Sequence, residues 1–211
     1  MNARRVLLLG STGLVGRELL SQLLADPGVA GVTAIVRRPS GMQHAKLSEH
    51  VFPLTEMERH VDLFAVDQIF CALGTTIKDA GSQAAFRVVD YDMPVNAAKL
   101  GRAQGATHYL LVSALGASAQ SRVFYSRVKG EAERDIIATG YPSVTIAQPS
   151  LLLGDRQKRR LGEEIAKPLG WLFPPKYRPI EGRDVARALV EAARENRAGV
   201  RVMESREMRR G

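Results

Sequence analysis

Three regularly spaced glycines give the chain its most specific chemical signal. Gly10, Gly13 and Gly16 spell G-x-x-G-x-x-G between an apolar run at residues 5–9 and a helical pattern. Glycine permits a tight turn, lets the backbone approach a pyrophosphate and lets helix and strand pack closely. Amide hydrogens at the helix start then face the anion. The pattern predicts a dinucleotide site, with a purely structural turn as the alternative, formed by Gly10, Ser11, Thr12, Gly13, Leu14, Val15 and Gly16.

Two arginines bear on which dinucleotide would bind. A carboxylate at the end of the second strand would accept hydrogen bonds from a ribose 2′-hydroxyl and select NAD. Here Val36 is followed by Arg37 and Arg38, and Asp26 comes too early in the chain to supply that acid. Because guanidinium groups match phosphate geometry, we expect NADP(H) to be preferred over NAD(H). The alternative is a pair of solvated loop arginines.

A second group of residues has the composition of a proton-transfer site. Tyr125 and Lys129 stand four residues apart on a predicted helix and therefore share one face. A free tyrosine has a pKa of about 10, and a nearby ammonium favours the phenolate. Ser113 follows the apolar run at residues 109–112, so its hydroxyl should lie at the ligand-binding edge of an α/β sheet. Serine and tyrosine converging on one carbonyl oxygen would suit hydride transfer.

Other catalytic chemistries lack their residues. Cys71, the single cysteine, lies in an apolar run and is expected to be a buried, inert thiol. His44, His50 and His60 stand among acidic residues, but their spacing matches no recognised ligand pattern, so no metal site is expected. Neither a G-x-S-x-G nucleophile turn nor a G-x-x-x-x-G-K-[ST] phosphate loop occurs.

Composition describes a globular chain. It has 211 residues, a net charge of +8 and 45% apolar residues, and a chain of this size buries roughly 70% of its unfolded surface. No apolar run is close to the length of about 18 to 20 residues that spans a bilayer. The apolar run at residues 6–9 is similar to the start of a signal peptide, but Gly10 and Gly13 interrupt it. We therefore expect a cytoplasmic protein without membrane contact. The basic cluster at residues 156–160 is expected to be a solvated or substrate-facing loop, so nucleic acid is an unlikely partner.

Short β-branched runs alternate with amphipathic helical patterns along the chain. This alternation predicts an α/β fold, a doubly wound parallel sheet in a single domain over residues 1–211. Residues 150–182 are rich in proline and predict a small irregular excursion on the substrate side, and the tail at 204–210 is expected to be frayed. The expected strands are 5–9, 32–36, 51–54, one within 65–73, 108–113, 143–147 and 200–203; the expected helices are 14–24, 83–103, 121–139 and 183–195.

The chain resembles a known family over nearly its whole length. The matching segments are residues 10–16, 70–76, 111–117, 125–129, 148–154 and 178–186. They are similar to atypical short-chain dehydrogenases/reductases, especially the small group similar to the Tat-interacting protein and to bacterial semialdehyde-dehydrogenase-like proteins.

The resemblance implies a Rossmann fold that binds NADP(H). It implies that Tyr125 is the acid/base, that Lys129 binds the nicotinamide ribose and lowers the phenol pKa, and that Ser113 orients the substrate. Residues implied to line the cofactor are Leu73, Gly74 and Thr75, and those beside the nicotinamide are Pro149, Ser150, Leu151 and Leu152.

Two positions depart from the family pattern. Asp90 stands where an asparagine is frequent, although Asn96 matches a later one, and Pro53 and Leu54 stand where an adenine-contacting aspartate is common. Some relatives bind the cofactor yet act as redox-sensing regulators.

The sequence thus favours an NADP(H)-dependent oxidoreductase for a small carbonyl or alcohol substrate, as a monomer or homodimer. The alternative is a non-catalytic NADP(H)-binding redox sensor that acts through a protein partner. Nucleic-acid binding through residues 156–160 is a weaker third hypothesis.

Overall fold

A parallel β-sheet forms the centre of the molecule. The computed structural model describes residues 3–153 and 178–209. Seven strands pair in the order β3-β2-β1-β4-β5-β6-β9, all parallel, so the order reverses between β1 and β4 as in a doubly wound sheet. Their bounds are β1 Arg4–Leu9, β2 Val29–Val36, β3 Leu47–Val51, β4 Gln68–Cys71, β5 His108–Val112, β6 Ser143–Gln148 and β9 Gly199–Glu204.

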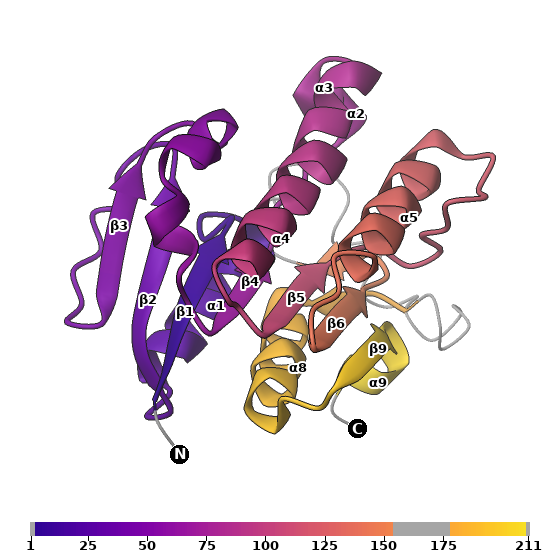
Figure 1. Cartoon of the computed structure of the whole chain (residues 1–211). Helices are drawn as coiled ribbons and strands as arrows, with labels where there is room; N and C mark the ends of the chain where they lie inside the picture. Colours follow the sequence, from indigo (N-terminus) through magenta and orange to yellow (C-terminus); the bar gives the residue numbers. More distant parts are fainter. Residues whose placement is uncertain (1–2, 154–177, 210–211) are drawn as a thin grey trace.

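Helices cover both faces of this sheet, and α4 and α5 lie side by side across one of them (Figure 1). The helices are α1 Leu14–Ala25, α2 Ile77–Ala80, α3 Gln83–Arg87, α4 Met93–Ala103, α5 Phe124–Ile137, α8 Gly182–Glu195 and α9 Ser205–Met208. Two 3-10 turns, η1 Leu54–Arg59 and η2 Val61–Phe64, follow β3, and a π-helical turn, η3 Val88–Asp92, joins α3 to α4.

Alternating side chains of β1 divide the core into two layers. Val6 and Leu8 pack into the cluster that contains α1 and α8, whereas Leu7 and Leu9 pack into the cluster on the α4 and α5 side. All four are fully buried, which is why the central strand reads as a continuous apolar run. The predicted doubly wound α/β fold is confirmed.

Three local expectations were wrong. The third strand is Leu47–Val51, a partly exposed edge strand, and Leu54 of the expected strand instead begins η1. The helix expected from residue 121 begins at Phe124, because residues 121–123 form a turn in which the Ser121 hydroxyl accepts from the Val123 amide at 3.1 Å. Within the expected frayed tail, Ser205–Met208 forms α9 with a capping box, and Met208 is fully buried in the core.

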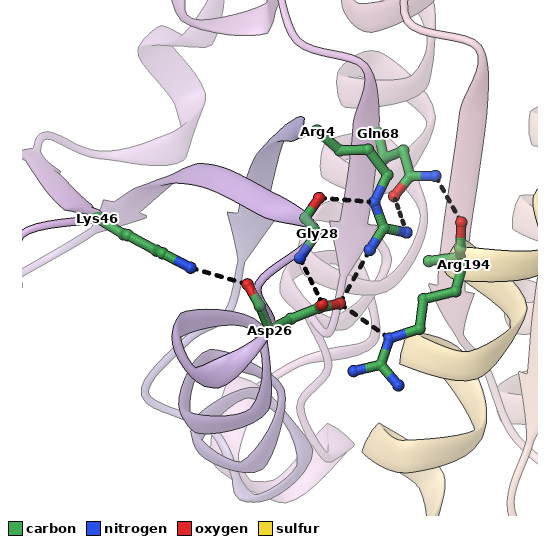
Figure 2. A network of polar contacts seen from close by, with 7 residues as sticks. Arg4, Asp26, Gly28, Lys46, Gln68 and Arg194 are labelled. Atoms are coloured by element: carbon green, nitrogen blue, oxygen red, sulfur yellow. Dashed lines mark hydrogen bonds and ion pairs between the residues drawn. The ribbon is translucent and has the colours of Figure 1, made fainter. Parts of the chain in front are cut away.

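A polar cluster lies at the amino-terminal ends of the strands, beside the ends of α1 and α8 (Figure 2). Asp26 accepts hydrogen bonds from Arg4 at 2.9 Å, Arg194 at 3.0 Å and the Gly28 amide at 2.8 Å. Burial opposes the charge of Asp26, but these donors and the two arginine charges outweigh it and hold the pKa of the carboxyl below its usual value. We call these three residues, Arg4, Asp26 and Arg194, the Asp26 cluster.

A second sheet, of two strands, follows the carboxyl end of β6. Here β7 Leu152–Leu153 pairs in parallel with β8 Ile180–Glu181. The rest of the expected excursion, including the basic cluster at 156–160, lies outside the described residues. No helix in residues 3–153 or 178–209 is long and apolar enough to cross a membrane.

Candidate functional site

A cavity of about 890 Å³ lies where β1, β2 and β4 end. Because all strands of the main sheet are parallel, these ends share the edge at which open α/β sheets bind ligands. The cavity is lined by eight residues predicted to bind a cofactor: Gly10, Ser11, Thr12, Gly13, Arg37, Leu73, Gly74 and Thr75.

The glycine turn has the close approaches that its sequence predicts. Gly10 has a φ of +82°, and a Cβ there would lie 2.6 Å from the Ala72 carbonyl oxygen. A Cβ on Gly16 would overlap the carbonyl of Gly10, whose oxygen accepts the Gly13 amide at 3.0 Å. The turn therefore tolerates no side chain at Gly10 or Gly16.

The other predicted members of this turn support it rather than face the cavity. Val15 is buried in the core, and Leu14 lies against Gly182 at the start of α8. Neither is among the described residues that line the cavity.

A buried polar atom in the turn fits an anionic ligand. The Ser11 hydroxyl is buried and has no hydrogen-bond partner among the described residues, although Ser11 lines the cavity. A buried hydroxyl without a partner is unfavourable, and a phosphate oxygen would satisfy it. The residues of the turn therefore fit the pyrophosphate of a dinucleotide.

The two arginines after β2 differ in position. Both are exposed, but Arg37 lines the cavity whereas Arg38 is absent from its described lining. Pro53 and Leu54, which stand in place of an acidic residue, also line the cavity, as does Ile35. These three side chains are apolar, and apolar side chains suit the face of a planar ring.

One carboxylate connects the cavity with the helix that carries Tyr125 and Lys129. Asp90, in η3, accepts the Thr75 amide at 2.9 Å and forms an ion pair with Lys129 at 2.7 Å. A Cβ on Gly74 would lie 3.7 Å from the Lys129 ammonium nitrogen. Lys129 is buried; burial opposes its charge, but Asp90 outweighs this and raises the pKa of Lys129.

Tyr125 is half-buried, with its ring 5.4 Å from the ring of Phe86. Burial raises the pKa of Tyr125; the charge of Lys129 opposes this, while the charge of Asp90 adds to it. Lys129 thus acts in the predicted direction, but the net pKa of the phenol lies above its usual value because burial and Asp90 prevail.

The Ser113 hydroxyl is directed toward a carboxylate that the sequence did not suggest. It donates to Glu133 of α5, which also accepts from the side-chain amide of Gln148 in β6 at 2.9 and 3.0 Å. Burial raises the pKa of Glu133, although both donors and the charge of Lys129 lower it in part.

Residues 149–152 run along the carboxyl end of β6. The Pro149 carbonyl accepts the Leu115 amide at 2.8 Å, and the Ser150 amide donates to Ser205 of α9 at 2.6 Å. Leu151 is exposed and Leu152 pairs with Ile180 in the small sheet. These residues are not part of the described lining of the 890 Å³ cavity, and neither are Ser113, Tyr125 and Lys129.

Sequence reasoning missed Glu133, Gln148 and much of the cavity wall. Glu133 lies four residues after Lys129, a helical spacing that places it on the same face and was available as a signal. The unpredicted wall comes from several elements: Ile35, Val36, Thr55, Ala72, Thr76, Asp79, Ala80, Ala85, Val89 and Met93.

Comparison with known proteins identifies the family. The model of a family described as NAD(P)H-binding matches residues 10–196, which include the glycine turn, the cavity and the helix α5. The chain belongs to this family. The family's description agrees with the anion-binding character of the turn.

Relatives extend over most of the chain. "Protein FMP52-1, mitochondrial" of Scheffersomyces stipitis is 34% identical over 203 residues, covering 89% of this chain and 87% of its own. "Protein HTATIP2" of Rattus norvegicus is 32% identical over 171 residues, covering 79% and 70%. A solved structure of MoeE5 with UDP-glucose and NAD has a TM-score of 0.73 at 18% identity, covering 94% of this chain and 75% of that one, which shows the shared fold.

These findings confirm the predicted family resemblance and correct one expectation. The relatives from Scheffersomyces stipitis, Candida albicans and Debaryomyces hansenii are all named as mitochondrial proteins. The expected cytoplasmic location, which rested only on composition and on the absence of an export signal, is therefore wrong.

Proposed function

We propose that this protein is an NADP(H)-dependent oxidoreductase acting on a small carbonyl or alcohol. The observation that carries the proposal is the position of Asp90, which binds both the cavity loop at Thr75 and the ammonium of Lys129. It links a dinucleotide-type cavity to the helix that carries the acid/base candidate Tyr125.

The proposed roles follow from the chemistry of each side chain. When bound, NADP(H) supplies or accepts the hydride at the substrate carbon. The Tyr125 hydroxyl donates a proton to the substrate oxygen in reduction and takes it back in oxidation. Lys129 stabilises the phenolate that remains, Asp90 limits that effect, and Ser113 orients the substrate oxygen.

Selection of NADP(H) is assigned to Arg37. This guanidinium is exposed and lines the cavity just after β2, where the sequence continues with Arg38 and Pro39 and not with an acidic residue. A fork of N–H donors with a permanent charge suits the 2′-phosphate. Arg38, one residue further, provides a matched control.

Fluorescence titrations with NADPH and with NADH test cofactor choice. The wild-type protein is expected to bind NADPH more tightly, and Arg37→Ala to reduce that preference about tenfold or more, since one charge-assisted contact is worth about 1.5 to 3 kcal/mol. Arg38→Ala is expected to keep most of the preference. An unchanged NADPH/NADH ratio in Arg37→Ala contradicts the assignment.

Tyr125→Phe tests the acid/base role. With a panel of small aldehydes and ketones, the variant is expected to lose turnover by about 100-fold or more, because general acid catalysis contributes about 10² to 10⁴. NADPH affinity should stay close to that of the wild type. Retained turnover contradicts the role, and wild-type protein that binds NADPH but turns over no compound of the panel favours the redox-sensor alternative.

A further inference from the structure

A buried carboxyl group lies behind Ser113 and has no part in the proposed chemistry. Only 9% of Glu133 is exposed, and it accepts hydrogen bonds from the Ser113 hydroxyl and from Gln148. Within residues 3–153 and 178–209, no basic side chain forms an ion pair with it. It thus differs from Asp90 and Asp26, each of which contacts a cation.

The groups around Glu133 come from three elements. Lys129, on the same helix, is the charged neighbour that favours the ionised form, but its ammonium is already paired with Asp90 of η3. Ser113 at the end of β5 and Gln148 at the end of β6 contribute uncharged donors. Burial therefore prevails, and the pKa of Glu133 lies above its usual value.

The state of Glu133 matters because a serine hydroxyl has a single hydrogen. If Glu133 is ionised, that hydrogen points to the carboxylate and Ser113 offers only lone pairs to a ligand. If Glu133 holds a proton, it can donate to Ser113, which frees the serine hydrogen for a substrate oxygen. The same pair of side chains thus has two hydrogen-bond directions.

We propose that Glu133 is a positioning residue that sets the direction of the Ser113 hydrogen bond, so that its acid form prepares Ser113 to donate to a carbonyl and its carboxylate form prepares Ser113 to accept from an alcohol. The substrate part of this proposal rests on the oxidoreductase function proposed above. The reversal itself involves only Glu133, Ser113 and Gln148. Tyr125 still exchanges the proton with the substrate oxygen, and the proton of Glu133 is not consumed.

Infrared difference spectra of the full-length protein test the reversal without any substrate. Wild type minus Glu133→Gln, recorded between about pH 4 and about pH 9, should show a protonated-carboxyl band that disappears as pH rises, with its midpoint above the ordinary glutamate value of 4.5. Ser113→Ala should move the midpoint upward, because the substitution removes a donor that favours the carboxylate. No such band at any pH, or an unchanged midpoint in Ser113→Ala, overturns the proposal. The second criterion needs only wild type and Ser113→Ala, so it decides even where Glu133→Gln does not fold.

Rates in the two directions test the consequence for substrate. The probes are 4-nitrobenzaldehyde with NADPH and 4-nitrobenzyl alcohol with NADP⁺. In Glu133→Gln the amide can donate to Ser113, so reduction should persist at alkaline pH where the wild-type rate declines, and oxidation should fall about tenfold. Equal pH profiles for wild type and variant overturn this consequence. If neither direction shows turnover, the proposed function fails, whereas the infrared result still decides the role of Glu133.

Discussion

The two edges of the parallel sheet hold buried carboxylates in different ways. At the amino-terminal edge, Asp26 contacts two arginines whose side chains are 18% and 52% exposed, and it also accepts a backbone amide. At the carboxyl-terminal edge, Asp90 has one cation, Lys129, which is almost fully buried, and Glu133 has two uncharged donors.

The difference lies in which protonation state the surroundings of each group favour. Burial opposes the charge of Asp26, but two arginines and a backbone amide together outweigh it, hold the pKa of that carboxyl low and connect the ends of α1 and α8. At the carboxyl-terminal edge, burial raises the pKa values of Tyr125 and Glu133, so both groups keep their protons to higher pH than they would in water. The Asp26 cluster therefore favours the charged form of its carboxyl group, whereas the surroundings of Tyr125 and Glu133 favour their neutral forms.

The largest effect is expected from Asp90→Asn. The substitution leaves Lys129, only 7% exposed, without its counter-charge, so the free energy of unfolding should fall by about 2 to 4 kcal/mol. It should also lower the pKa of Tyr125, because the charge of Asp90 opposes the phenolate. Urea unfolding followed by circular dichroism measures the first effect, and a spectrophotometric phenol titration the second.

Asp92→Asn is the matched control for that substitution. Asp92 is exposed and ends the same π-helical turn, so its loss should change stability by no more than about 0.5 kcal/mol. If the two variants unfold alike, the Asp90–Lys129 pair does not stabilise the fold and the contrast drawn above is wrong.

A smaller effect is expected from Asp26→Asn. The free energy of unfolding should fall by about 1 to 2 kcal/mol at neutral pH, because both arginines can turn toward solvent. Since the folded pKa of Asp26 is lowered, the wild-type advantage is present above the ordinary value of 3.8 and is lost as pH falls through the folded pKa. Acid and urea titrations of both proteins measure it. Glu18→Gln, which changes an exposed residue of α1, is the control. Unchanged NADPH affinity in Asp26→Asn would show that the amino-terminal edge affects stability without affecting the proposed cofactor site.

The smallest effect on the free energy of unfolding is expected from Glu133→Gln, and it is an increase, not a decrease. Because the folded pKa of Glu133 is raised, its contribution is complete below the ordinary value of 4.5 and declines as pH rises through the folded pKa. The variant should therefore match the wild type in acid and become more stable by about 1 kcal/mol at alkaline pH. Urea midpoints over a pH series provide the comparison, and a variant that is less stable at alkaline pH would show that Glu133 is stabilised as a carboxylate.

Much of the fold was predictable because buried parallel strands are continuous apolar runs. The runs at 5–9 and 143–147 became β1 and β6 with bounds close to those expected. The third strand was misplaced because Leu47–Val51 is an edge strand with mixed, partly exposed residues, while the more apolar segment after it contains Pro53 and forms a 3-10 turn. The tail was misjudged because two buried side chains, Ser205 and Met208, anchor its charged helix.

The candidate site also has one part that could be predicted from the sequence and one that could not. The glycine turn could be predicted because its residues are consecutive and the close approaches arise within one strand–turn–helix unit. The spacing of four residues from Lys129 could have placed Glu133 on the same helix face, but not against Ser113. The contacts of Ser113 with Glu133 and of Lys129 with Asp90 form only when α5 packs against β5 and η3.

By itself, the sequence determined the parallel α/β fold, the tight glycine turn after the first strand and the order Ser113, Tyr125, Lys129 along the chain. Local sterics and hydrophobic periodicity suffice for these, because they act between neighbours along the chain. Only the tertiary structure decided that Arg37 lines the cavity while Arg38 does not, that Asp90 neutralises Lys129 and that Glu133 holds the Ser113 hydroxyl. Burial and charge pairing set the protonation of these groups, and both depend on which distant segments are brought together.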